Sequence, residues 1–169
     1  MSSRPDRQQR IDVQISLNQA NIIIEVSDIL NKIAESRFDG QNTKHVNDMQ
    51  PETDFRQDND LVKSFFDTAI CNVIKRIGPY VNCGEWNETT SCYDLNLSFP
   101  PRWNETRSQV LENSIKNYIV YHIIWQWLEK VSIEDAPYYM AKAEKLLRDV
   151  KAACESRHGK VHYGWNTTY

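Results

Sequence analysis

Three residues near the C-terminus have types and a spacing that could hold a metal ion. Cys154, His158 and His162 recur at intervals of four residues, so on one continuous helix they would share a face and offer a thiolate and two imidazoles to zinc. However, Gly159 is expected to end such a helix, and the sequence supplies no fourth ligand nearby. His122 lies in an apolar stretch without a nucleophile or acid to pair with. We therefore predict a core histidine, no metal site and no catalytic residue.

The segment 41–58 is rich in carboxylates, among them Asp54 and Asp58. Carboxylate oxygens bind divalent cations, but these acids do not follow the spacing of a calcium-binding loop. A solvated acidic loop is the favoured interpretation. The sequence also lacks a nucleophile elbow, a glycine-rich phosphate loop and a zinc-protease motif. We expect neither enzymatic activity nor a cofactor.

Large aromatic residues occur outside every segment with helical periodicity. Trp86 and Trp103 stand among turn-forming residues, and Tyr163, Trp165 and Tyr169 lie in a C-terminal stretch without a regular period. An exposed large ring is unfavourable in water unless a partner covers it. We interpret these five side chains as interface anchors, whereas Trp125 and Trp127 fall within a helical stripe and are expected in the core.

A basic excess marks the segment before the C-terminus and includes Lys145, Arg148 and Lys151. Such a face can contact phosphate groups. The basic residues are diluted by acids such as Glu144 and Asp149, so the polar face of an amphipathic helix is the favoured interpretation.

The elements that must position these residues follow from hydrophobic periodicity. Residues 11–17 and 92–99 alternate apolar and polar side chains, which predicts two strands that pair with each other or with neighbouring subunits. Intervals of three and four residues predict four helices. The expected helices run from about 18 to 38, from 59 or 60 to 77, from a capping box at 106–109 to about 131, and from a second capping box at 132–135 to about 157.

The whole chain has 169 residues, a net charge of −3 and 40% apolar residues, which suits one domain with a core. Its polar N-terminus does not resemble an export signal, and no apolar run is long enough to span a membrane. We predict a mainly α fold: a four-helix domain with a small two-stranded β element and extended N- and C-terminal arms. The domain covers 11–157, with an acidic loop at 41–58 and a strand/loop insertion at 80–102, between arms at 1–10 and 158–169.

Several segments together resemble structural proteins of tailed bacteriophages and prophages of Bacteroides-type bacteria. They are Leu97-Ser98-Phe99-Pro100-Pro101-Arg102-Trp103, the helix that reaches Trp125-Gln126-Trp127-Leu128, the turn Glu134-Asp135-Ala136-Pro137-Tyr138-Tyr139, and the final helix with its basic tail. The helices around 26–34 and 60–69 are similar to the first half of such proteins. The resemblance extends over most of residues 20–160. The alternating N-terminal segment, the acidic loop and the aromatic arm depart from the pattern.

This resemblance implies a head-to-tail connector, or adaptor. Such a protein is made in the host cytoplasm and forms a ring in the virion neck, commonly of about twelve copies. Its partners would be further copies of itself, the portal protein and an adjacent neck or tail protein. Genomic DNA would pass through the channel without sequence-specific binding, and no membrane would be involved. The alternatives are a tail-completion or tail-terminator protein and, from another class, a small cytosolic helical DNA-binding regulator.

Two contacts are expected within such a ring. The acidic loop, with Asp54 and Asp58, would face the basic surface of Lys145, Arg148 and Lys151 on the next subunit. The arm 158–169 would dock on the portal or on an adjacent ring protein through its aromatic side chains.

Overall fold

The computed structural model describes residues 9–36 and 56–159 and is mostly helical. These residues form four α-helices, as the periodicity predicted. They are α1 (Gln19–Ser36), α3 (Arg56–Ile77), α4 (Ser108–Val131) and α5 (Ala136–Glu155). Of the two predicted arms, the described part is limited to residues 9–10 and 158–159. No helix within the described ranges is both long enough and apolar enough to cross a membrane.

The β element has three strands, not two. β1 (Ile11–Asn18) and β3 (Cys92–Phe99) pair with each other, the first of the two predicted alternatives, and the pairing is antiparallel. β2 (Val81–Asn87) adds a third strand on the other side of β3. β2 places Val81, Cys83 and Trp86 at unequal spacings and contains Gly84, so it lacks the regular alternation that marks β1 and β3. Pairing with β3 makes it a strand, and a register shift between Val81 and Cys83 disturbs that pairing.

The sheet has one apolar face and one polar face. Ile15 and Leu17 of β1 are buried together with Leu95, Leu97 and Phe99 of β3. The opposite face carries polar side chains, where the Ser16 hydroxyl donates a hydrogen bond of 2.7 Å to Asp94 Oδ1. The helices therefore cover only one face of the sheet.

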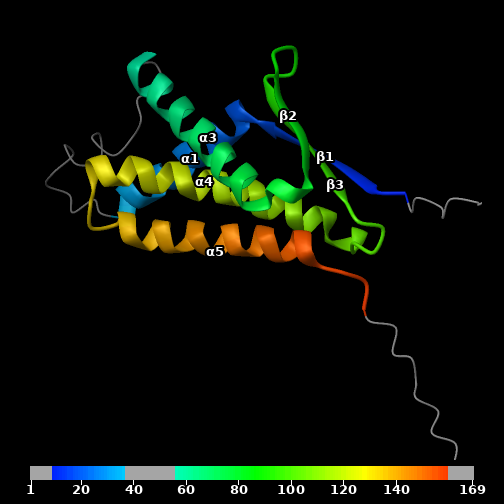
Figure 1. Ribbon diagram of the computed structural model, residues 1–169. Coiled ribbons are helices and arrows are strands. Elements are labelled where there is room, and N and C mark those ends of the chain that lie inside the picture. The colour runs from blue at the N-terminus through cyan, green and yellow to red at the C-terminus, as the bar shows by residue number, and fades with distance from the viewer. Residues whose placement is uncertain (1–8, 37–55, 160–169) are drawn as a thin grey trace, which may run out of the picture.

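Helix α4 is the centre of the core. It packs antiparallel beside α5 and also contacts α1 and α3, while the sheet lies toward one end of the helical layer (Figure 1). Because it has neighbours on several sides, it is buried around most of its circumference. Its buried residues are Leu111, Ser114, Ile115, Tyr118, Ile119, Val120, His122, Ile123, Ile124, Trp127 and Leu128.

Three helix starts differ from the prediction. α5 begins at Ala136, and the backbone N–H of Asp135 donates to the carbonyl of Ser132 and not to its side chain, so the predicted capping box at 132–135 was wrong. α3 begins at Arg56, so Asp58 belongs to a helix and not to the acidic loop, of which residues 41–55 lie outside the described ranges. Its first turn contains no apolar residue, which is why periodicity placed the start later. Before α4, the side chain of Asn104 accepts the backbone N–H of Thr106 at 3.2 Å and opens a short 3₁₀ turn (Glu105–Arg107). The cap is therefore Asn104, and the predicted capping box at Thr106 was wrong.

Candidate interaction surfaces

Trp103 is not an exposed anchor, which corrects the interpretation from sequence. Its side chain is 0% exposed and stacks on Phe99 with ring centroids 4.0 Å apart. Its indole N–H donates a hydrogen bond of 2.9 Å to the carbonyl of Ala153 in α5. The segment before α4 folds back onto the end of α5 and closes over the ring, a tertiary contact that local sequence does not reveal.

The root of the C-terminal arm is tied to the same place. Trp103 and Arg157 form an isolated antiparallel bridge, and the backbone N–H of His158 donates to the carbonyl of Arg102 at 3.0 Å. The backbone N–H of Asn104 donates to Ser156. The aromatic residues of the arm, Tyr163, Trp165 and Tyr169, lie outside the described residues. The chain therefore leaves the domain from a fixed point beside Trp103.

Trp86 is exposed, as its interpretation as an anchor requires. It lies on β2 opposite Tyr93, and 42% of its surface is accessible. The β2–β3 hairpin projects from the helical layer (Figure 1). Its turn is held by Asn87 Oδ1, which accepts the backbone N–H groups of Thr89 and Thr90. A projecting hairpin with a hydrogen-bonded turn thus presents a large apolar ring.

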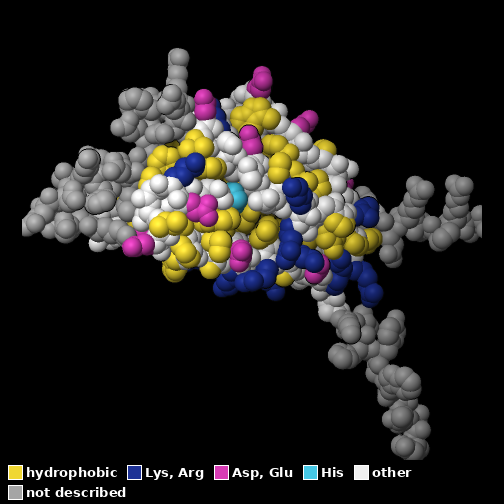
Figure 2. All heavy atoms as spheres, turned by 60° about the vertical axis from the view of Figure 1, so that its left-hand side comes forward, with side chains coloured by type: hydrophobic (Ala, Val, Ile, Leu, Met, Phe, Trp, Pro, Cys, Tyr) yellow, Lys and Arg dark blue, Asp and Glu magenta, His cyan; other side chains and the backbone are white. Residues whose placement is uncertain are grey.

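Three of the four basic residues of α5 lie on its exposed side. Lys145, Arg148 and Lys151 are all exposed, and Figure 2 shows lysine and arginine side chains gathered along the lower edge, with acidic side chains among them. Lys151 pairs with Glu155 at 3.8 Å, a solvent-exposed pair of small energetic value. For the predicted acidic partners, Asp54 lies outside the described residues and Asp58 belongs to the first turn of α3.

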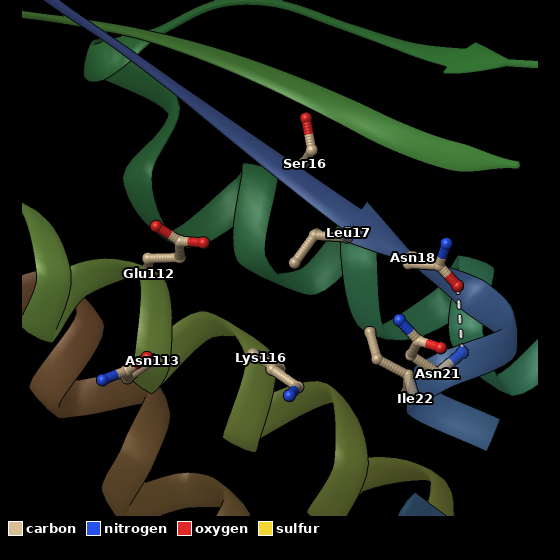
Figure 3. A pocket seen from close by; sticks show the side chains of 8 residues that line it. All are labelled: Ser16, Leu17, Asn18, Asn21, Ile22, Glu112, Asn113 and Lys116. Carbon is tan, nitrogen blue, oxygen red and sulfur yellow. Dashed lines mark hydrogen bonds between the residues drawn. The ribbon is translucent and has the colours of Figure 1, made fainter. Parts of the chain in front are cut away.

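A polar hollow of about 230 Å³ lies between β1, the start of α1 and α4 (Figure 3). Its polar side chains are partly engaged: Asn18 Oδ1 accepts the backbone N–H of Asn21, which caps α1, and Lys116 pairs with Glu25 at 3.2 Å. Leu17 points toward α4, whereas Ser16 points away from it. The lining combines amides, one acid and one lysine without a nucleophile–base pair, so we assign it no chemistry. The lining residues are Ser16, Leu17, Asn18, Asn21, Ile22, Glu112, Asn113 and Lys116.

An apolar groove of about 330 Å³ lies at the turn between α4 and α5. Ile133 in this turn is 75% exposed, the highest value among the large apolar side chains of the described residues. The Trp125 indole N–H already donates to Glu129 Oε1 at 2.9 Å, so what this ring offers a ligand is its apolar surface. Sequence reasoning missed the groove, because it read 132–135 only as a helix cap. The lining residues are Trp125, Glu129, Ile133, Ala136, Pro137 and Met140.

A cluster of tyrosines surrounds the amino group of Lys142 near this turn. Its Nζ lies 4.6 Å from the ring centroid of Tyr138, 5.2 Å from that of Tyr121 and 5.8 Å from that of Tyr139. Hydrogen bonding to Tyr138 raises the pKa of Lys142, so the group stays protonated. The contact fixes the first turns of α5 against α4 by cation–π attraction. In the sequence, Lys142 belongs to the basic segment before the C-terminus, and nothing in that pattern predicts the tyrosine cluster.

His122 is a buried core residue, as predicted. Its Nδ1 lies 3.5 Å from the Tyr118 hydroxyl, which in turn accepts a hydrogen bond from Asn72 Nδ2. The rings of His122 and Trp125 lie at right angles to each other, with centroids 5.3 Å apart. Burial lowers the pKa of His122 to about 4, and its Nε2 has no hydrogen-bond partner. The ring is therefore neutral at physiological pH and packs as an aromatic side chain.

Of the C-terminal cysteine and histidines, the structure describes Cys154 and His158. Cys154 is buried, and burial raises the pKa of its thiol to about 12, which disfavours the thiolate that a metal requires. His158 follows the end of α5 at Glu155, and His162 lies outside the described residues. Within 9–36 and 56–159, no three His, Cys, Asp or Glu side chains are grouped closely enough to hold a metal ion.

Comparison with known proteins adds no family to this description. No protein-family model, curated protein or solved structure matches the chain.

Proposed function

We propose that this chain is a structural subunit of a phage neck, which assembles into a ring between the portal and the tail. The proposal rests on the sequence resemblance over most of residues 20–160 and on one structural observation. The described domain exposes large apolar side chains on several separate elements, and a subunit of a closed ring needs two different surfaces that face its two neighbours.

The two surfaces lie on different elements. One is the β2–β3 hairpin with Trp86, and the other is the α4–α5 turn with Ile133 and the 58% exposed Tyr138. Large exposed apolar side chains of this kind are enriched at binding surfaces. The rigid α4–α5 pair would set the angle between the two contacts.

The charged face of α5 is the third element of the proposal. Lys145, Arg148 and Lys151 would meet acidic residues of the neighbouring subunit, in line with the expectation from sequence. Changing all three to Glu should impair ring assembly without unfolding the domain, because all three are exposed. The matched control changes Lys63, Lys75 and Arg76, three exposed cations of α3, to Glu. If both triple variants assemble to the same extent, the proposed contact through the basic face of α5 is wrong.

The proposal is tested by mixing the chain with the portal protein of the phage that encodes it. Light scattering gives the mass of the chain alone and of the mixture at micromolar concentration, and negative-stain imaging gives the shape. We expect a ring that forms with the portal. A chain whose mass is indifferent to the portal would contradict the connector proposal and favour a tail-completion role or a function outside the virion.

The same preparation tests the other alternative class. A DNA-binding regulator would bind duplex DNA through α5, with an affinity that falls steeply as salt rises. A neck subunit would contact DNA only as the channel wall and show no preference for sequence. Sequence-specific duplex binding by the chain alone would therefore favour the regulator.

A further inference from the structure

We infer that the groove at the α4–α5 turn receives the C-terminal segment 160–169 of a second copy of this chain. The inference rests on the proposed function, since it names the partner of one surface of the ring subunit. The groove and the root of the segment lie at opposite ends of α5. Each copy would thus give a segment at one end and accept one at the other.

The chemistry of the two parts is complementary. The groove offers the Trp125 ring, Ile133 and Met140, and the residues 160–169 contain Trp165 and two tyrosines. The turn 129–135 carries three carboxylates and one lysine, whereas 160–169 carries Lys160 and His162 and no acidic side chain. An aromatic anchor with basic flanks therefore fits an apolar groove with an acidic rim.

The reach of the chain favours a second copy over the same copy. α5 has 20 residues and is about 30 Å long, and Ile133 lies beyond its first residue. The segment starts from His158, which is fixed to Arg102, and Trp165 follows seven residues later, so a fully extended chain carries it at most about 25 Å. Trp165 therefore falls short of Ile133 in its own subunit. It would have to run fully extended back along α5 to come near Met140, which lies about 23 Å from the end of the helix, whereas a neighbouring subunit has no such restriction.

A contact that passes from one end of a subunit to the other end of the next is heterologous, and it closes into a ring when the rotation between subunits allows. A single arm in a single groove is a small interface, so we expect association of the free chain with a dissociation constant on the order of 100 µM. Binding to a common portal would raise the effective concentration and complete the ring.

The test combines two variants of the full chain. Ile133→Lys spoils the groove and leaves the segment intact, and Trp165→Ala spoils the segment and leaves the groove intact. Ile24→Lys, at an exposed isoleucine of α1, is the matched control. Ile133 is exposed, so its substitution should leave the far-ultraviolet circular dichroism and the unfolding midpoint unchanged.

Sedimentation equilibrium at several hundred micromolar gives the masses. We expect the wild type and Ile24→Lys to form oligomers larger than dimers, and each of the two test variants alone to associate about 30-fold more weakly, as the loss of a central anchor does. An equimolar mixture of the two should regain association but stop at a heterodimer, because only one segment and one groove remain functional in each pair.

Three results would overturn the inference: a wild type that stays monomeric at this concentration, test variants that associate like the wild type, or a mixture that stays monomeric. None of these decides the proposed function, which the portal experiment tests separately. A wild type that forms a ring on the portal while the mixture stays monomeric would retain the neck proposal and discard the arm contact. If the mixture of the two variants associates but the wild type does not bind the portal, the arm contact is retained and the neck proposal is discarded.

Discussion

The two ends of α5 differ in whether the large apolar side chains beside them are buried or exposed. At the C-terminal end, Trp103 is fully buried, stacks on Phe99 and donates a hydrogen bond to Ala153. At the N-terminal end, Ile133 and Tyr138 remain exposed beside the apolar groove. One end of the helix is thus closed by the chain itself, whereas no residue of the described ranges closes the other.

This difference separates stability from association. Residues at the closed end contribute to the fold, because removing them leaves a cavity or an unpaired group. Residues at the open end contribute little to the fold and are available to a partner. Substitutions at the two ends should therefore change different measured quantities.

The largest effect is expected from Trp103→Ala. Loss of the buried ring and its hydrogen bond should lower the free energy of unfolding by about 4 kcal/mol, as large-to-small changes of buried aromatic residues do. Urea denaturation followed by circular dichroism measures it. Trp86→Ala, at the exposed tryptophan of the hairpin, is the control and should cost less than about 1 kcal/mol. Equal losses of unfolding free energy for the two variants would contradict the distinction between buried and exposed aromatic residues.

The second effect is a dependence of stability on pH that comes from His122 in the middle of α4. Its pKa in the folded chain is about 4, below the ordinary value of 6.5, so the unfolded chain binds a proton in a range where the folded chain does not. The neutral His122 ring therefore contributes to the free energy of unfolding above about pH 6.5. This contribution, at most about 3 kcal/mol, is lost as the pH falls toward 4.

Unfolding free energies of the wild type and of His122→Gln between pH 7.5 and 4.5 test this assignment. The variant should show a flatter profile, even though its stability at pH 7.5 is lower. His158→Gln changes an exposed histidine and should keep the wild-type slope. A slope unaffected by His122→Gln would assign the pH dependence to other groups.

A smaller effect is expected in the sheet from Gly84→Ala. A Cβ atom at this position would lie 2.5 Å from the Tyr93 hydroxyl oxygen and 3.0 Å from its ring, so the tyrosine must move. We expect a cost of about 1 to 2 kcal/mol in thermal or urea unfolding. Gly78→Ala, which meets no atom within 4 Å, is the control.

Adding Tyr93→Phe to Gly84→Ala removes the nearest atom and should recover part of the loss. No recovery would mean that the contact with the hydroxyl is not the cause. If Gly84→Ala lowers the free energy of unfolding no more than Gly78→Ala does, the sheet accommodates the added methyl group without strain.

The smallest effect on stability is expected at the open end, from Lys142→Met. The methionine keeps the apolar stem but removes the charge that lies over the rings of Tyr138 and Tyr121, a loss of about 0.5 to 1 kcal/mol. Lys145→Met, on the exposed face of the same helix, is the control. A loss comparable to that of Trp103→Ala would mean that the turn is part of the closed core.

Regular periodicity was enough to predict most elements of the fold. The alternation at 11–17 and 92–99 located β1 and β3 and their pairing, and the intervals of Ile22, Val26 and Leu30 located α1. The first turn of α3 was missed because its residues are polar, and strand β2 because its apolar residues follow no regular period. Their structure depends on the neighbours they contact and not on their own pattern.

The candidate surfaces were harder to predict for the same reason. Trp86 and Trp103 stand in similar turn-rich sequence, yet only the structure shows that one projects on a hairpin and the other lies under the end of α5. Exposure of Ile133 depends on how tightly the α4–α5 turn closes, which residue types alone do not specify. Lys142 was read as one of many basic residues because its tyrosine neighbours come from two helices.

The most direct test of the neck proposal is the number of chains bound to one portal ring, measured by native mass spectrometry of the mixed complex. The proposal predicts a closed ring with a fixed copy number of about twelve, reduced or lost for Ile133→Lys and retained for Ile24→Lys. Absence of a complex, or a variable and incomplete occupancy with the wild-type chain, would contradict it.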